Sequence, residues 1–507
     1  MYWVAVCGGN KLMNAASARR PLFREKWRMA FPVGQVIFLL LLLGLGGALI
    51  LATMEKAAFN TVILLGFVSI CGLMLCRITQ IRLNDPALKI LGYLWLIKLG
   101  ITLFLLYVGW MPQLDPSSAL WGYDPQRYYI QAQELIDNNW SPDFLNLNYV
   151  GILYYYGAIY YILGHNPVIP ALINAFVTLI ASLYLIQVGY EIKSQRKSRD
   201  WTLAFVLLLP ELLWYDVMTS REMLMAAILL LALLTTGRYL ARTAAISFSK
   251  VVVVDCLSMF AIAAVRTSML LPMVASIGLM AVLVNPRNDS RLAPKTILVV
   301  CAIVALMAMP VIAGYLGGYN FDFGSAIEIA ASASKNIASS ADMEWSQNSI
   351  GMLLMPEGVL QSLLFVLPRL VLYLVSPLPN IFVSGSDLLA GSWVAWEKLF
   401  VLFSSVINIL IIPYALAGFV DSLKKRKLNA SPLVFHISYW ITFLAIAGGN
   451  LIIHERYRVM ASSLLYGCAW LGARTCSKNL IARATLFWYG LLTLGATFYI
   501  VYKFIFS

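Results

Sequence analysis

Residues 35–53 read QVIFLLLLLGLGGALILAT, an apolar stretch without a charged side chain. Its length is close to the roughly 20 residues that a membrane-spanning helix needs. Similar runs recur along the chain, which has 507 residues, 61% of them hydrophobic and 12% charged. Soluble domains average about a quarter charged residues, so the sequence predicts an all-α, polytopic transmembrane helical bundle. A β-barrel is not expected, because barrel strands alternate apolar and polar residues.

Thirteen apolar runs are predicted as membrane spans. Their approximate bounds are 35–53, 60–76, 89–110, 166–188, 201–217, 223–237, 250–265, 268–284, 295–314, 398–419, 431–450, 459–474 and 484–502. The first run is predicted to be retained, because no small-residue cleavage site of a signal peptide follows it.

The basic residues predict the orientation, since cytoplasmic loops carry an excess of lysine and arginine. Seven clusters fall on one side of these spans. They are Arg19/Arg20/Arg24/Lys26/Arg28, Arg77/Arg82/Lys89, Lys193/Arg196/Lys197/Arg199, Arg238/Arg242/Lys250, Arg287/Arg291/Lys295, Lys424/Lys425/Arg426/Lys427 and Arg474/Lys478/Arg483. We therefore expect a cytoplasmic N-terminus. The membrane itself is expected to be a bacterial inner membrane. The net charge of +13 is attributed to these loops and not to nucleic-acid binding.

Two further apolar runs are predicted to start and end on the outer side, because a single crossing by either would invert the later clusters. The run 148–164, NYVGILYYYGAIYYILG, is rich in tyrosine, whose amphipathic ring suits the headgroup region. It is predicted to lie on the outer face. The run 358–379 contains Arg369 and is interrupted by prolines, which break helices. It is predicted as a re-entrant or surface pair of helices, or as two short spans.

The spans divide the chain into six segments. They are a cytoplasmic N-terminal segment (1–34), the first three spans (35–110), an outer loop with juxtamembrane helices (111–165), the central spans (166–316), an outer loop with the re-entrant or surface helices (317–397) and the C-terminal spans (398–507). The seven cysteines show neither zinc-ligand spacing nor a disulfide framework. No carboxylate or histidine cluster has ligand spacing either, so no cofactor is expected, with a divalent metal left open.

The segment WGYDPQRYYIQAQELI, 121–136, is unusually polar for its place after an apolar run. It is predicted to lie outside, where further ionisable residues gather at helix ends: Asp115, Asp216, Arg221, Glu222, Arg266, Arg369, His454, Glu455, Arg456 and Arg458. Such groups are costly near hydrocarbon and are candidates for function. A carboxylate can act as a general base, and guanidinium groups bind phosphate oxygens bidentately. The combination favours displacement of a sugar from a phosphate leaving group.

The segment from Asp124 to Asn166 resembles the first outer loop of GT-C fold glycosyltransferases. The resemblance lies in the order of its parts: Asp124 with Arg127 and Tyr128, an amphipathic helix at about 125–137, the tyrosine-rich helix and Gly164-His165-Asn166. The likeness is to the protein-mannosyltransferase and aminoarabinose-transferase branch, over roughly 90–475. LLPELLWYDVMTSREMLMAAILL (208–230) resembles the second outer turn of that family, and HERYRVMASSLL (454–465) its late Arg-Tyr element near the donor phosphate. The sequence departs from the family pattern in three ways. It has a single acid where the family has a pair, two extra spans precede the loop, and no outer C-terminal domain is expected.

The resemblance implies the role of Asp124 and of the Arg-Tyr element, and the side-chain chemistry of the other candidates suggests theirs. Asp124 would be the catalytic base. The donor-phosphate residues would be Arg127, Arg369, Arg456 and Arg458. Acceptor-site or secondary roles would fall to Asp216, Arg221, Glu222, Tyr128 and His165.

Several candidates also have a structural interpretation, although Arg369 has none. Asp124 before Pro125 is a common helix start, and Arg127 could snorkel to the interface. Arg221 and Glu222 could cap a helix or pair with each other, and Arg266 could be a turn residue. Asp216 could be a solvated loop acid, and Arg456 and Arg458 could anchor the chain to the membrane.

Three functions remain open. The first is an inverting glycosyltransferase that moves a sugar from a polyprenyl-phosphate donor to an envelope or lipid-linked glycan acceptor on the outer face. The second is an O-antigen or exopolysaccharide polymerase using undecaprenyl-diphosphate-linked repeats, for which the outer loop 317–357 and Arg369 would be central. The third is a transporter of a lipid-linked glycan. The expected partners are the lipid bilayer, the polyprenyl-linked sugar and the acceptor, and no nucleic acid.

Overall fold

The computed structural model describes residues 31–53, 57–114, 124–142, 150–193, 200–243, 246–266, 269–284, 298, 359–375, 386, 392–426, 430–449 and 455–506. Every regular element in these ranges is a helix. Apart from Leu298, the predicted span 295–314 lies outside them, as do the loop 317–357, Asp115 and His454.

Eight of the described helices are long and apolar enough to cross a membrane, which supports the predicted class of multi-pass helical membrane protein. They are α1 (Val33–Thr53), α2 (Ala58–Leu83), α3 (Ile90–Leu105) with the short turns that flank it, α6 (Val168–Lys193), α8 (Glu222–Leu240), α9 (Phe248–Arg266), α17 (Trp393–Lys425) and α20 (Lys478–Phe506). The shorter helices α10 (Leu270–Leu283), α18 (Ser431–Gly449) and α19 (Val459–Thr475) lie among them.

Two apolar runs differ from the prediction. The run 201–217 is not one helix: a 3-10 helix, η5 (Thr202–Leu208), is followed by α7 (Pro210–Asp216). Pro210 explains the break, because it has no N–H to continue a helix and it favours the first helical position. By contrast, the run 358–379 is not broken at Pro368, since α15 (Val359–Val375) continues through that proline as one helix.

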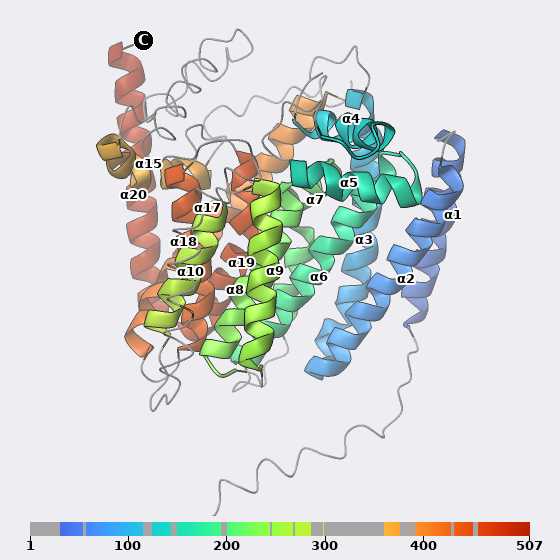
Figure 1. Ribbon diagram of the computed structural model, residues 1–507. Helices are drawn as coiled ribbons and strands as arrows, with labels where there is room; N and C mark the ends of the chain where they lie inside the picture. The colour runs from blue at the N-terminus through green and yellow to red at the C-terminus, as the bar shows by residue number, and fades with distance from the viewer. Residues whose placement is uncertain are drawn as a thin grey trace, which may run out of the picture.

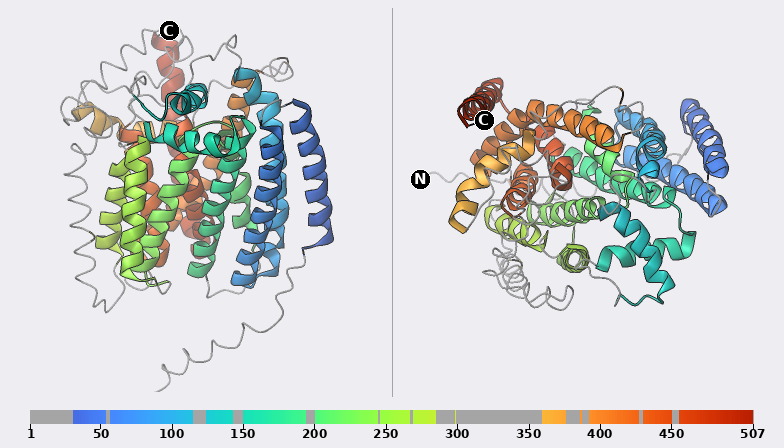
Figure 2. Two further views of the ribbon diagram at one scale, coloured as in Figure 1. Left: turned by 45° about the vertical axis from the view of Figure 1, so that its right-hand side comes forward. Right: turned by 90° about the horizontal axis from the view of Figure 1, so that it is seen from above.

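The long helices run side by side, and α4 (Asp124–Asp137) and α5 (Val150–Leu163) lie across one end of them (Figures 1 and 2). Helix α15 lies at the same end. This arrangement agrees with the prediction that the runs around 125–137 and 148–164 form two helices that do not cross the bundle. We call this the α4 end.

Local signals explain how the chain passes from α5 into α6. Gly164 has φ of +97°, a left-handed conformation that favours glycine, and its N–H donates to the carbonyl of Tyr160 (2.8 Å) to close α5. Two residues later, the Asn166 side chain accepts from the N–H of Val168 (2.9 Å) and caps α6. The Gly-His-Asn sequence is therefore a helix stop followed by a helix start.

Ion pairs mark the opposite end of the bundle. Arg238 in the last turn of α8 pairs with Glu191 near the end of α6 (2.7 Å), and Arg474 in the last turn of α19 pairs with Asp200 (2.7 Å). Both arginines belong to clusters that are predicted to face the cytoplasm. Two of these clusters therefore lie away from the α4 end.

Helices α17 and α19 approach each other closely through glycine. A Cβ at Gly472 would lie 1.9 Å from the carbonyl oxygen of Tyr414, and the Gly472 Cα is 3.0 Å from the position of a Cβ at Gly418. Small residues allow such backbone contact between membrane helices. The contact fixes α19, whose other end carries the residues described next.

Candidate active site

Asp124 is the first residue of α4 and faces a residue that is 332 positions away in the sequence. The Nη1 of Arg456, in the short helix η8 (Glu455–Tyr457), donates to Asp124 Oδ2 at 3.0 Å. The side chain of Asp124 is 35% exposed and that of Arg456 is 15% exposed. The structure therefore joins the predicted base and one predicted phosphate-binding arginine at a partly open site.

Tyr457 lies next to this pair and holds a second arginine. Its hydroxyl accepts from Arg456 Nη2 (3.0 Å), and the guanidinium of Arg266, at the end of α9, lies 4.6 Å from the centre of its ring. The Arg456 guanidinium is 5.0 Å from the same ring. Cation–π contacts of this kind orient guanidinium groups without using their hydrogen-bond donors.

The start of α8 completes the cluster. Arg221 lies with its guanidinium 5.9 Å from the ring centre of Tyr128, one turn after Asp124 on α4. It also forms an ion pair with Glu222 at 3.7 Å. Arg221, Glu222 and Tyr128 are all buried, whereas Arg127 on α4 is exposed.

The charges of this cluster act on Asp124. Burial by itself raises the pKa of its carboxyl, but the charges of Arg456, Arg221 and Arg127, with the hydrogen bond from Arg456, outweigh burial and hold the pKa below its usual value. The pKa of Tyr457 is also lowered, because Arg456, Arg266 and Arg221 outweigh the effect of its burial. The site therefore favours negative charge.

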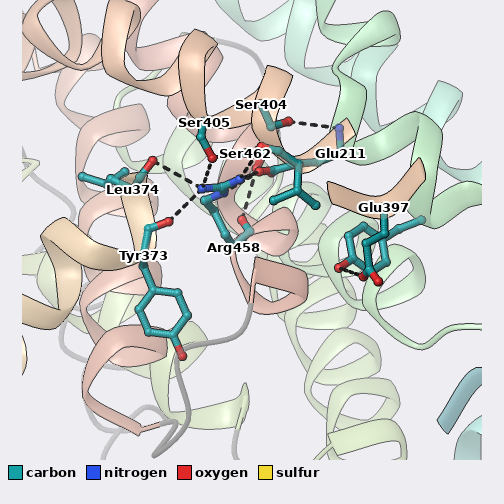
Figure 3. A network of polar contacts seen from close by, with 10 residues as sticks. Glu211, Tyr373, Leu374, Glu397, Ser404, Ser405, Arg458 and Ser462 are labelled. Carbon is teal, nitrogen blue, oxygen red and sulfur yellow. Dashed lines mark hydrogen bonds and ion pairs between the residues drawn. The ribbon is translucent and has the colours of Figure 1, made fainter. Parts of the chain in front are cut away.

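Arg458 does not belong to this cluster, contrary to the expectation that it lies on the outer surface. It is 1% exposed and pairs with Glu211 of α7, also 1% exposed (Figure 3). Its Nη1 donates to the carbonyls of Tyr373 (2.9 Å) and Leu374 (3.3 Å) in α15. A guanidinium with these contacts is already occupied and is not placed to bind a phosphate.

Asp216 also lies inside the bundle, and the expectation of a surface acid is not met. It is fully buried, accepts a hydrogen bond from Lys98 of α3 (2.5 Å) and another from Thr178 of α6 (3.1 Å). Ionisable side chains in apolar surroundings need such partners. Asp216 therefore has a structural environment.

The two remaining candidates lie in different surroundings. Arg369 is buried in α15. His165 stacks on Tyr129 with ring centres 4.2 Å apart, and its Nε2 lies 3.1 Å from the Tyr129 carbonyl oxygen. The pKa of His165 is lowered, chiefly by burial. These contacts give His165 a role in attaching α4 to the start of α6.

Four residues that contact the predicted site residues were not themselves predicted as site residues. Tyr457 and Arg266 belong to the cluster, and Glu211 and Lys98 are the buried partners of Arg458 and Asp216. Glu211 and Lys98 carried a usable signal, because each is a charge within an apolar run. Arg266 carried the signal of an ionisable residue at a predicted helix end, and Tyr457 that of the Arg-Tyr element.

Among the described residues, no three His, Cys, Asp or Glu side chains come together in a group that could hold a metal ion. Comparisons with protein-family models, curated proteins and solved structures find no match to this chain.

Proposed function

We propose that this protein is a membrane glycosyltransferase that moves a sugar from a polyprenyl-phosphate donor to a hydroxyl of an envelope or lipid-linked glycan. One observation carries the proposal: a partly exposed carboxylate, Asp124, is held by Arg456 within a cluster of arginines at one end of an apolar helix bundle. We place the site at the outer face of a bacterial inner membrane, following the predicted orientation.

The charge of the cluster favours an anionic substrate. Arg456, Arg266, Arg221 and Arg127 contribute four positive charges, against the two carboxylates of Asp124 and Glu222. Guanidinium groups bind phosphate oxygens through paired donors, and they would stabilise the charge that develops on the departing phosphate. The surrounding bundle offers apolar surface for a prenyl chain.

Asp124 would serve as the general base. Its Oδ2 accepts from Arg456, and its side chain is 35% exposed, so an acceptor hydroxyl could reach the carboxylate. In the proposed step the acceptor oxygen attacks the anomeric carbon and its proton passes to Asp124. The bond between that carbon and the phosphate oxygen breaks, and the phosphate leaves with the electron pair. Attack from the face opposite the phosphate inverts the anomeric configuration.

The test is a product assay in proteoliposomes with radiolabelled polyprenyl-phosphate sugars and a crude lipid-linked glycan. Asp124→Asn is compared with Asp137→Asn, which alters an exposed aspartate at the other end of the same helix. We expect wild type and Asp137→Asn to transfer single sugars and Asp124→Asn to fail at equal protein level.

Two results would replace the proposal. Ladders of repeats from diphosphate-linked units, made without need of Asp124, would identify a polymerase. Accumulation of a lipid-linked glycan inside vesicles, with no new covalent product, would identify a transporter.

A further inference from the structure

Glu211 has a carboxylate that is fixed at both oxygens. Its Oε1 pairs with Arg458, and its Oε2 accepts from the Ser462 hydroxyl of α19. Its backbone N–H donates to the Ser404 hydroxyl of α17 at 3.1 Å. Arg458 and Ser462 therefore hold the side chain of Glu211, and Ser404 of α17 holds its backbone at the start of α7, as Figure 3 shows.

The guanidinium of Arg458 is fixed just as firmly. Besides Glu211, it donates to the Ser405 hydroxyl of α17 (3.1 Å) and to the carbonyls of Tyr373 and Leu374. These two carbonyls belong to the last turn of α15, where helical carbonyls have no partner within their own helix. Arg458 therefore joins α7, α15 and α17 to the first turn of α19.

Arg456 is attached to this anchor by one residue. Arg458 directly precedes α19, and Tyr457 alone separates it from Arg456. The ion pair of Arg456 with Asp124, at 3.0 Å, joins η8 to a helix that lies across the bundle. A small displacement of Arg458 would therefore carry Arg456 out of reach of Asp124.

We propose that Glu211 is a positioning residue, which acts through Arg458 to hold η8 where Arg456 contacts Asp124. The consequence for catalysis rests on the proposed function, whereas the geometry of η8 does not. The two are therefore tested by separate measurements on the same variants.

The first measurement needs no activity. Asp124→Cys and Arg456→Cys are combined, and the yield of the 124–456 crosslink made by a short bismaleimide is measured by peptide mass spectrometry. The ion pair is absent in this background, so the yield reports where the backbone of η8 lies. Adding Glu211→Gln is expected to lower the yield several-fold.

The matched control is Asp200→Asn. Asp200 is also a buried carboxylate that pairs with an arginine of α19, Arg474, but at the end of that helix away from η8. We expect it to lower the melting temperature without lowering the crosslink yield. An unchanged yield in Glu211→Gln, with a melting temperature lowered as in the control, would overturn the proposal.

The second measurement uses transfer activity as a function of pH. The groups that surround Asp124 are Arg456 and Tyr457 of η8, Arg221 and Glu222 of α8, Arg127 and Tyr128 of α4 and Arg266 of α9. If Arg456 moves away, Asp124 loses the positive charge that lowers its pKa most. The acid limb of the pH–activity profile should therefore move to higher pH in Glu211→Gln. A misplacement of about 1 Å can also cost about 100-fold in rate. Asp200→Asn should keep the wild-type limb.

Two further variants close the test. Glu211→Gln added to Arg456→Ala should shift the acid limb no further than Arg456→Ala alone, and a further shift would contradict an action through Arg456. If Glu211→Gln does not fold, Ser462→Ala takes its place, because it removes the hydrogen bond to Glu211 Oε2 but retains both charges. Its crosslink yield should be lower than that of the double-cysteine background. An unchanged yield would count against the proposal. A lowered yield in a protein without transferase activity would support the positioning role and reject the proposed function.

Discussion

Arg456 and Arg458 stand two residues apart, and each pairs with a carboxylate, but the two pairs lie in opposite surroundings. The side chains of the Arg456–Asp124 pair are 15% and 35% exposed. Those of the Arg458–Glu211 pair are 2% and 1% exposed, and serines and backbone carbonyls surround them. A ligand could reach the first pair, whereas the second has its donors and acceptors occupied within the protein.

This difference separates binding from stability. An ion pair near water contributes little to folding, because both ions remain partly solvated. A buried pair that loses one partner leaves an uncompensated charge in an apolar interior. Substitutions in the first pair should therefore change activity with little effect on stability, whereas substitutions in the second should lower stability and change activity only through the position of η8.

The largest expected effect is on activity at the exposed pair. Asp124→Asn should lower kcat by about 100- to 10,000-fold, the range for loss of a general base, and should leave the melting temperature near that of wild type. Steady-state transfer assays and thermal unfolding in the same detergent measure both quantities. A variant that retains activity would remove Asp124 from the reaction.

The next effect is on stability at the buried pair. Arg458→Ala should lower the free energy of unfolding by about 3–5 kcal/mol, because it leaves Glu211 buried without its cation. Arg456→Ala should cost about 0.2–1 kcal/mol. Denaturant unfolding of both variants measures the contrast, and equal losses would mean that burial does not distinguish the pairs.

A smaller effect is expected on donor binding. Arg456→Lys keeps the positive charge but loses the forked donors that contact Asp124 and Tyr457. A charge-assisted hydrogen bond is worth about 1.5–3 kcal/mol, so KM for the polyprenyl-phosphate sugar should rise by about 10- to 100-fold. Lys98→Arg, at the buried pair with Asp216, is a control in which KM should not change.

The smallest effect is a shift with pH. The folded pKa of Asp124 lies below the ordinary value of about 3.9 for an aspartate. Its pair with Arg456 therefore contributes stability fully above that ordinary value, and this contribution is lost as pH falls through the folded pKa. The acid limb of kcat/KM should follow the same group and move to higher pH in Arg456→Ala. An identical limb in wild type and variant would show that Asp124 is not the titrating group.

Much of the fold follows from local sequence. The apolar run at 35–53 is a helix because a helix pairs the backbone N–H and C=O groups of a membrane span within the segment itself, and α4 begins at Asp124 followed by Pro125. The position of 148–164 across the end of the bundle follows from its tyrosines and from the basic clusters, whose sides a crossing would invert. The continuation of α15 through Pro368 could not be predicted in this way. A helix can continue through a proline where neighbouring helices pack against it, and α15 packs against α17 and α18, which are distant in the sequence.

The candidate site, too, is determined partly by the local sequence and partly by the tertiary structure. Residue types and predicted topology were sufficient to place Asp124, Arg221 and Arg456 on one face of a membrane protein. They could not distinguish Arg456 from Arg458, because the direction of each side chain depends on partners 332 and 247 residues away. Hydrophobic patterning is a local property of the chain, whereas the pairing of charges depends on which distant segments the packed helices bring together.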